Sequence, residues 1–111
     1  MLMFHFTKPA NHASARQGLD MLLMAVSLDQ PCCALYSGEA LEQLLKPLSS
    51  FDPLKKIGML DAVFDFADIY VDSASFTAMN VSVDNFRVPV KVIDSAEIDR
   101  LNSQAKHKLL F

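Results

Sequence analysis

The only two thiols of this chain, Cys32 and Cys33, are adjacent and begin a short apolar run. A thiolate can carry a sulfane sulfur or act as a redox nucleophile, so this pair is the first candidate for chemistry. Neighbouring residues on a strand point to opposite faces, which argues against joint metal ligation and against a disulfide between them. We therefore expect two small core side chains rather than a reactive pair. With no third cysteine for a disulfide framework, a reducing cytoplasm is the simpler assumption.

Carboxylates recur at short intervals between residues 61 and 72. They are Asp61, Asp65, Asp68 and Asp72. A divalent cation or an acid–base pair could use such a series. Nothing in it resembles a calcium loop, however, and helix ends and solvated loop edges account for the spacing. We therefore predict no metal site from these residues.

The three histidines, His5, His12 and His107, lie in separate predicted elements and show no paired spacing. His5 and His107 could meet if the first and last strands are neighbours, but two ligands are too few for a metal site. Ser73 and Ser75 offer no triad signature, and we expect these hydroxyls to cap a helix or to form a turn.

Glycine is too scarce for the common phosphate-binding motifs. The chain has only Gly18, Gly38 and Gly58, so neither a dinucleotide fingerprint nor a P-loop can be written. We predict no cofactor. In an open α/β sheet a ligand would bind at the carboxyl ends of the strands, here in the loops that follow Phe6, Tyr36, Val71 and Ile93.

Short apolar runs alternate with amphipathic stretches along the chain. The runs predict strands at Leu2–Phe6, Cys32–Tyr36, 67–71, 86–93 and 108–111. We expect Asn11 or Ser14 to cap the first helix and Pro31 to stop it. Further helices are predicted over residues 39–45, 52–63 and 95–105, with Asp52 and Ser95 as caps, and a short helix or turn over residues 73–79.

This alternation decides the expected architecture. A chain of 111 residues makes one domain, residues 1–111. Strands that alternate with helices imply right-handed crossovers and a parallel sheet with helices on both faces. We therefore predict an α/β fold: a single three-layer α/β/α domain with a mostly parallel five-stranded sheet and a flavodoxin- or Rossmann-like outline.

Charge and hydropathy exclude some partners and favour others. The net charge is −3, and the ten basic residues are scattered, so direct binding to nucleic acid is not expected.

The apolar start at residues 1–6 has no basic region before it and is too short for a signal peptide. No apolar run in the sequence is long enough to cross a membrane. Hydrophobic residues make up 51% of the chain, a surplus that a subunit interface would bury, with Phe111 as one expected contact.

Several short stretches, spread over nearly the whole chain, match the sequence pattern of a known protein family in order and in spacing. They are residues 15–23, 29–31, 37–39, 43–45, 57–61, 69–71 and 109–111. On these stretches the chain resembles the TusC/DsrF branch of the DsrE/F/H sulfur-relay proteins. None of the stretches is a catalytic signature, so the resemblance points to a lineage more directly than to a chemistry.

The resemblance also implies where sulfur would be carried in this family. In the sulfur-bearing relatives the working cysteine follows the strand that aligns with residues 67–71, and this chain has Asp72 and Ser73 there. Neither a carboxylate nor a hydroxyl can replace a thiolate as carrier of a sulfane sulfur. The resemblance thus implies a non-catalytic assembly subunit of a cytoplasmic TusBCD/DsrEFH-type heterohexamer. Its TusD/DsrE-like and TusB/DsrH-like sister subunits would complete a relay of persulfide sulfur toward 2-thiouridine in tRNA.

Other functions stay open at this point. The chain could be a sulfurtransferase or redox carrier that acts through Cys32 or Cys33, or a DsrF-type protein of sulfur oxidation. A third hypothesis is a stand-alone homo-oligomeric binding module with Ser37, Asp72 and Asp94 as the polar lining of its pocket.

Overall fold

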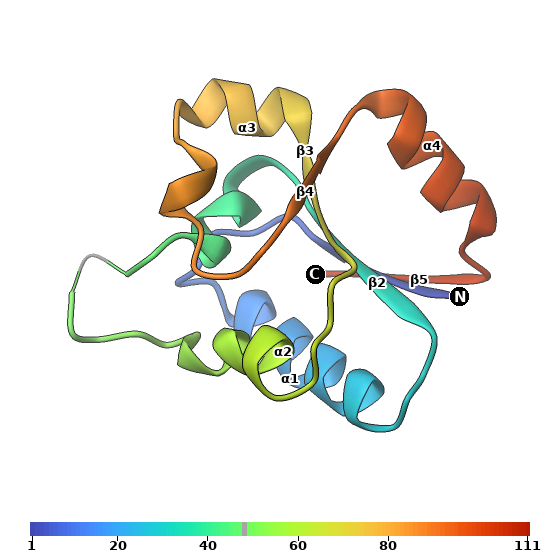
Figure 1. Ribbon diagram of the computed structural model, residues 1–111, viewed down its shortest axis with the longest axis horizontal. Helices are drawn as coiled ribbons and strands as arrows, with labels where there is room; N and C mark the ends of the chain where they lie inside the picture. Colours follow the sequence, from blue (N-terminus) through green and yellow to red (C-terminus); the bar gives the residue numbers. More distant parts are fainter. Residues whose placement is uncertain (48) are drawn as a thin grey trace.

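A five-stranded parallel sheet forms the centre of the computed structural model, which describes residues 1–47 and 49–111 (Figure 1). Its strands are β1 (Leu2–Phe6), β2 (Cys32–Tyr36), β3 (Ile69–Asp72), β4 (Lys91–Ile93) and β5 (His107–Leu110). They lie in the order β4-β3-β2-β1-β5, and every adjacent pair is parallel. The predicted α/β fold with a parallel five-stranded sheet is therefore confirmed.

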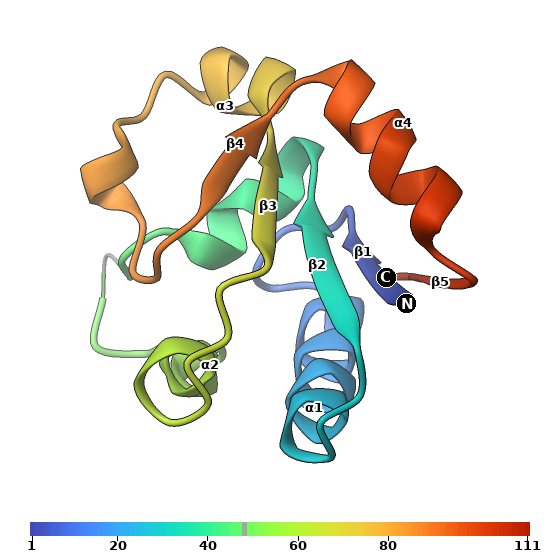
Figure 2. The same ribbon diagram turned by 45° about the vertical axis from the view of Figure 1, so that its right-hand side comes forward.

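Helices cover both faces of this sheet (Figure 2). The α-helices are α1 (Ala13–Ser27), α2 (Met59–Ala62), α3 (Ser73–Met79) and α4 (Ser95–Gln104). Three short 3-10 helices are η1 (Gly38–Leu44), η2 (Lys55–Gly58) and η3 (Val83–Asn85). Helices α1 and α2 lie on one face, and α4 lies on the other. None of the helices in the described part of the chain is long and apolar enough to cross a membrane.

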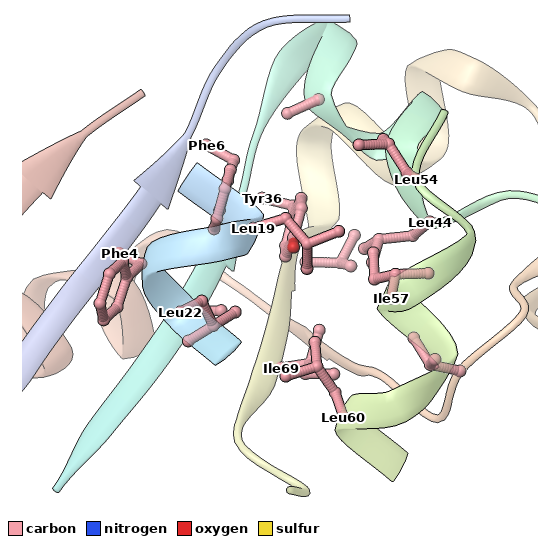
Figure 3. Packing of buried hydrophobic residues seen from close by; sticks show 14 of the residues in the cluster. Phe4, Phe6, Leu19, Leu22, Tyr36, Leu44, Leu54, Ile57, Leu60 and Ile69 are labelled. Atoms are coloured by element: carbon pink, nitrogen blue, oxygen red, sulfur yellow. The ribbon is translucent and has the colours of Figure 1, made fainter. Parts of the chain in front are cut away.

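Alternation along the strands divides the core into a large and a small cluster. On β1, Phe4 and Phe6 enter the large cluster beneath α1, whereas Met3 enters the small cluster beneath α4. All five residues of β2 are buried, as the unbroken apolar run predicted for a strand covered on both faces. Figure 3 shows the large cluster, in which side chains of β1, β2 and β3 meet those of α1, η1, η2 and α2.

Gly18 lets α1 approach the sheet closely beside β1 and β5. A Cβ added there would lie 2.4 Å from Cε1 of Phe6 and 2.8 Å from Cγ of Phe111. The Phe111 ring stacks on Phe6, with 5.6 Å between ring centroids. Phe111, which we expected to contact a sister subunit, therefore packs within its own chain. The large apolar side chain that is exposed next to it is Leu110, with 72% of its surface accessible.

The structure corrects two predicted features of α1. Its N-cap is His12, whose Nδ1 accepts a hydrogen bond from the Ser14 amide at 3.1 Å, rather than Asn11 or Ser14 itself. The helix also ends at Ser27, well before Pro31. The backbone turns away at Asp29, which has a positive φ of 56°, so the proline follows a break that already exists.

The cap of α4 is also one residue earlier than predicted. Asp94 accepts a hydrogen bond from the Glu97 amide at 2.9 Å, and Ser95 is the first helical residue. A carboxylate at this position satisfies one of the free amides of the first turn and complements the helix dipole.

Residues 52–63 form less helix than the sequence predicted. The Asp52 carboxylate accepts a hydrogen bond from the Leu54 amide, and regular structure begins only at η2 and continues into α2. Leu54, Ile57 and Leu60 are buried, whereas Met59 and Val63 are 38% and 62% exposed.

Three predicted strands have different bounds in the structure. The predicted strand 67–71 is replaced by β3, which begins at Ile69 and includes Asp72. Only Lys91–Ile93 of the predicted strand 86–93 is a strand, because Pro89 has no amide hydrogen to donate to a neighbour. The last strand, β5, starts one residue earlier than expected.

Candidate functional site

Polar side chains meet at the carboxyl edge of the sheet, where parallel α/β sheets bind their ligands. His5 lies near the end of β1, and Ser37 directly follows β2. The Nε2 atom of His5 and the Oγ atom of Ser37 are 2.8 Å apart, a hydrogen bond between residues 32 positions apart in sequence. The register of the two parallel strands, which pairs His5 with Leu35 and Phe6 with Tyr36, produces this contact.

A second set of hydrogen bonds joins the ends of β2 and β3. The Gly38 amide donates to Oγ of Ser75 at 2.8 Å, and this hydroxyl donates to Oδ2 of Asp72 at 2.9 Å. The other oxygen of Asp72 accepts from the Ala74 amide and so caps α3. Gly38 has a φ of +59°, a conformation that suits glycine at the sharp turn from β2 into η1. We call His5, Ser37, Asp72 and Ser75 the carboxyl-edge row.

The electrostatic setting keeps the imidazole of this row neutral. Burial lowers the pKa of His5 below its usual value, and the negative charge of Asp72 opposes this effect only in part. A neutral imidazole can either accept a hydrogen bond from the Ser37 hydroxyl or donate one to it. The carboxyl-edge row is thus held by hydrogen bonds within the protein. It contains no thiol, because the only cysteines of the chain lie in β2.

Both cysteines are buried at the opposite, amino end of β2. Cys32 is 7% exposed and belongs to the large cluster, whereas Cys33 is 1% exposed and belongs to the small cluster. Their side chains therefore lie on opposite faces of the sheet, as the strand pattern predicted.

The chemistry of the two thiols follows from this burial. Burial and, more weakly, the charge of Asp68 raise the pKa of Cys32. Burial, followed by the nearby Cys32 and Asp68, raises the pKa of Cys33 to about 11. Both thiols are thus protonated at neutral pH, the opposite of what a nucleophilic or sulfur-carrying cysteine needs.

Other residues considered for chemistry are not brought together. Strands β1 and β5 are neighbours, but their register pairs His107 with Leu2 and His5 with Leu110, so the two histidines lie at opposite ends of the pair. Within residues 1–47 and 49–111, no group of three or more His, Cys, Asp or Glu side chains could hold a metal ion. Asp94, the third member of the hypothesised polar lining, caps α4.

The hydrogen bonds of His5 with Ser37 and of Ser75 with Asp72 were not predicted from the sequence. Ser37 and Asp72 were considered as pocket lining, and Ser75 as a capping hydroxyl. The signal that could have identified the row is positional: a polar side chain stands at or just after the end of each of three successive parallel strands. Without the strand register, however, this pattern does not show which of these side chains touch.

Comparisons with known proteins agree on the lineage. The sequence profile of the DsrE/DsrF-like family matches residues 1–111. A TusC homologue from Vibrio vulnificus (strain CMCP6) is 27% identical over 109 residues, which cover 95% of this chain and 92% of that protein. The crystal structure of the YchN protein from E. coli superposes with a TM-score of 0.81, covering 99% of this chain and 97% of that one. At 13% sequence identity this last likeness shows the fold alone. The resemblance to the TusC/DsrF branch is confirmed, and the chain belongs to the DsrE/DsrF-like family.

Proposed function

We propose that this chain is a non-catalytic assembly subunit of a cytoplasmic sulfur-relay complex. Membership of the DsrE/DsrF-like family and the identity with a TusC homologue support a sulfur-relay subunit in general. In the proposed complex, of TusBCD/DsrEFH type, the chain joins TusD/DsrE-like and TusB/DsrH-like sister subunits in a heterohexamer. The complex passes persulfide sulfur toward 2-thiouridine in tRNA.

The observation that carries this proposal is the pair of hydrogen bonds that the Asp72 carboxylate accepts. Asp72 is the last residue of β3, at the position where the resemblance puts the sulfur-bearing cysteine of related subunits. Here the carboxylate is already engaged by the Ala74 amide and the Ser75 hydroxyl. A carboxylate cannot form the sulfur–sulfur bond that a persulfide requires. Sulfur carried at this edge of the sheet must therefore be carried by a partner's cysteine.

The exposed apolar side chains support a role in assembly. Met21 and Met24 on α1 and the C-cap residue Leu28 follow one another at i, i+3 and i+7, so they lie on one flank of the helix. They are 46%, 65% and 74% exposed. Leu110 on the edge strand β5 is also exposed. Large apolar side chains that share a surface favour protein–protein contact.

A reconstituted relay tests whether this chain carries sulfur. The chain would be mixed with its two sister subunits and a persulfide donor, and transfer to the next acceptor would be followed with labelled sulfur. We expect the double variant Cys32→Ser, Cys33→Ser to support the same transfer rate as the unaltered chain. Loss of transfer in a complex that still assembles would instead favour the alternative, a sulfurtransferase or redox carrier acting through Cys32 or Cys33.

The acceptor of the relay requires a separate test in the host. Deletion of the coding sequence should lower the content of 2-thiouridine in tRNA, measured by mass spectrometry of digested tRNA. Unchanged 2-thiouridine together with defective oxidation of reduced sulfur compounds would assign the chain to a DsrF-type role instead.

A further inference from the structure

Three buried polar atoms have no hydrogen-bond partner among the described residues: Oη of Tyr36, Oε1 of Gln43 and Nε of Arg87. Tyr36 and Gln43 are 0% exposed. A buried polar group that is left without a partner is costly, and such groups are rare in folded proteins. Arg87 is hydrogen-bonded to Gln43 and its charge acts on Tyr36, so we look for one partner that could satisfy all three atoms.

The Arg87 side chain is fixed against the backbone of Gln43, and the Gln43 side chain is itself held by a hydrogen bond. Arg87 donates from Nη2 to the Gln43 carbonyl oxygen at 2.9 Å and from Nη1 to Oδ2 of Asp52 at 2.6 Å. The Gln43 amide nitrogen donates to the Lys8 carbonyl oxygen at 2.8 Å. Since that carbonyl can only accept, Oε1 of Gln43 must face the other way. Neither side chain can turn to satisfy its remaining atom without losing a bond that it already makes.

Tyr36 enters the same layer from the sheet. Its ring stacks on Phe6 with 4.5 Å between centroids, and the hydroxyl points from β2 into the space between the sheet and the helices on the α1 face (Figure 3). The charge of Arg87 partly offsets the rise that burial causes in the Tyr36 pKa, so the guanidinium lies within electrostatic range of the hydroxyl.

We propose that Tyr36, Gln43 and Arg87 form a binding site for an internal water molecule. The three free atoms complement one another: Nε of Arg87 donates, Oε1 of Gln43 accepts, and the Tyr36 hydroxyl can do either. A buried water makes about three hydrogen bonds. A water here would accept from Arg87, donate to Gln43 and complete its set with Tyr36.

One residue of the site also lines a pocket. Arg87 and Asp52 line a pocket of about 540 Å³, together with Leu45, Leu54 and Asn85. Glu42, which precedes Gln43 on η1, belongs to the same lining. We expect a water in the internal site to exchange with solvent from this side.

A crystal structure of the unaltered protein at a resolution that shows ordered solvent tests the site directly. We expect density for one water within hydrogen-bond distance of all three atoms. Clear density for the three side chains, with no water between them, would overturn the proposal. This measurement depends on no variant.

The substitution Tyr36→Phe provides a second test. If a water is bound, loss of the hydroxyl should lower the melting temperature by about 4 °C and weaken the water density. A hydroxyl without any partner would give the opposite result, because its removal would raise the melting temperature. Tyr70→Phe is the matched control, because the substitution keeps the ring and removes a hydroxyl whose hydrogen bond to Asp68 is long, at 3.4 Å. We expect a change of about 1 °C or less.

Discussion

At the scale of single residues, the assignment of function rests on which side chains are free to react. Cys32 and Cys33 are buried and protonated, whereas the polar residues at the carboxyl edge are engaged with one another. The carboxyl-edge row therefore stabilises the ends of three strands and contains no sulfur carrier. Its one histidine is His5, whose pKa burial lowers below the usual value, and this gives the first prediction.

Acidification should destabilise the protein through His5. Because the folded-state pKa lies below the value of about 6.5 for an unfolded chain, the unfolded state binds the proton first as the pH falls. The stability that the neutral imidazole contributes is therefore present at pH 7.5 and is lost as the pH falls through about 6.5 and below. Urea denaturation at pH 7.5 and 5.5 should show a smaller pH effect in His5→Gln than in the unaltered chain. An equal pH effect in both proteins would contradict this role of His5.

The ion pair between Asp52 and Arg87 gives a prediction for a lower pH window. The hydrogen bond from Arg87, together with its charge, lowers the pKa of Asp52, so the ionised carboxylate stabilises the fold above about pH 4 and this contribution is lost at lower pH. Asp52→Asn should lower the unfolding free energy at pH 7 by about 1–2 kcal/mol, because the guanidinium loses its charged partner. The exposed Asp20→Asn is the control. Equal destabilisation by both substitutions would show that the loss of a negative charge, rather than the loss of the ion pair with Arg87, lowers the unfolding free energy.

At the scale of elements, the packing of α1 on the sheet depends on Gly18. The substitution Gly18→Ala would gain about 1 kcal/mol in helix propensity but would place a Cβ against the buried Phe6 ring. Overpacking of a core commonly costs about 1–3 kcal/mol, so we expect a net loss of stability in chemical denaturation. Gly58→Ala is the matched control, because nothing lies within 4 Å of an added Cβ there. Stabilisation by Gly18→Ala would contradict the close approach of α1.

Elements with strong local signals could be predicted from the sequence. The strands Leu2–Phe6 and Cys32–Tyr36 have the predicted bounds, because each is an apolar run that ends at polar or turn-forming residues. The predicted strand 86–93 was too long, because apolar alternation continues through a proline that cannot pair. The His12 cap was missed because an imidazole is an uncommon capping group.

The candidate site could be predicted only in part. The sequence places Ser37 and Asp72 near the carboxyl edge, since each lies at the end of a predicted strand. The contact of His5 with Ser37 depends on the register of β1 against β2, and register is a property of the assembled sheet. Local patterns could not supply it.

At the scale of the whole molecule, the fold leaves apolar side chains on its surface. Half of the residues are hydrophobic, and Met24 and Leu28 on α1 stay mostly exposed. We expect the chain to self-associate when it is produced without partners, and we expect Met24→Lys with Leu28→Lys to reduce this association in sedimentation experiments. The exposed, neutral pair Gln17→Lys with Gln30→Lys, which also adds two positive charges, would control for the added charge. A monodisperse monomer at high concentration would contradict the prediction.

The central claim is that this chain helps to build a relay whose sulfur is carried by another subunit. The most direct test is native mass spectrometry of the tagged chain isolated from its own host. We predict a defined complex that contains two small paralogous chains, with any persulfide on a cysteine of a partner. Recovery of this chain alone, with an added sulfur atom on Cys32 or Cys33, would contradict the claim and would make the chain itself the carrier.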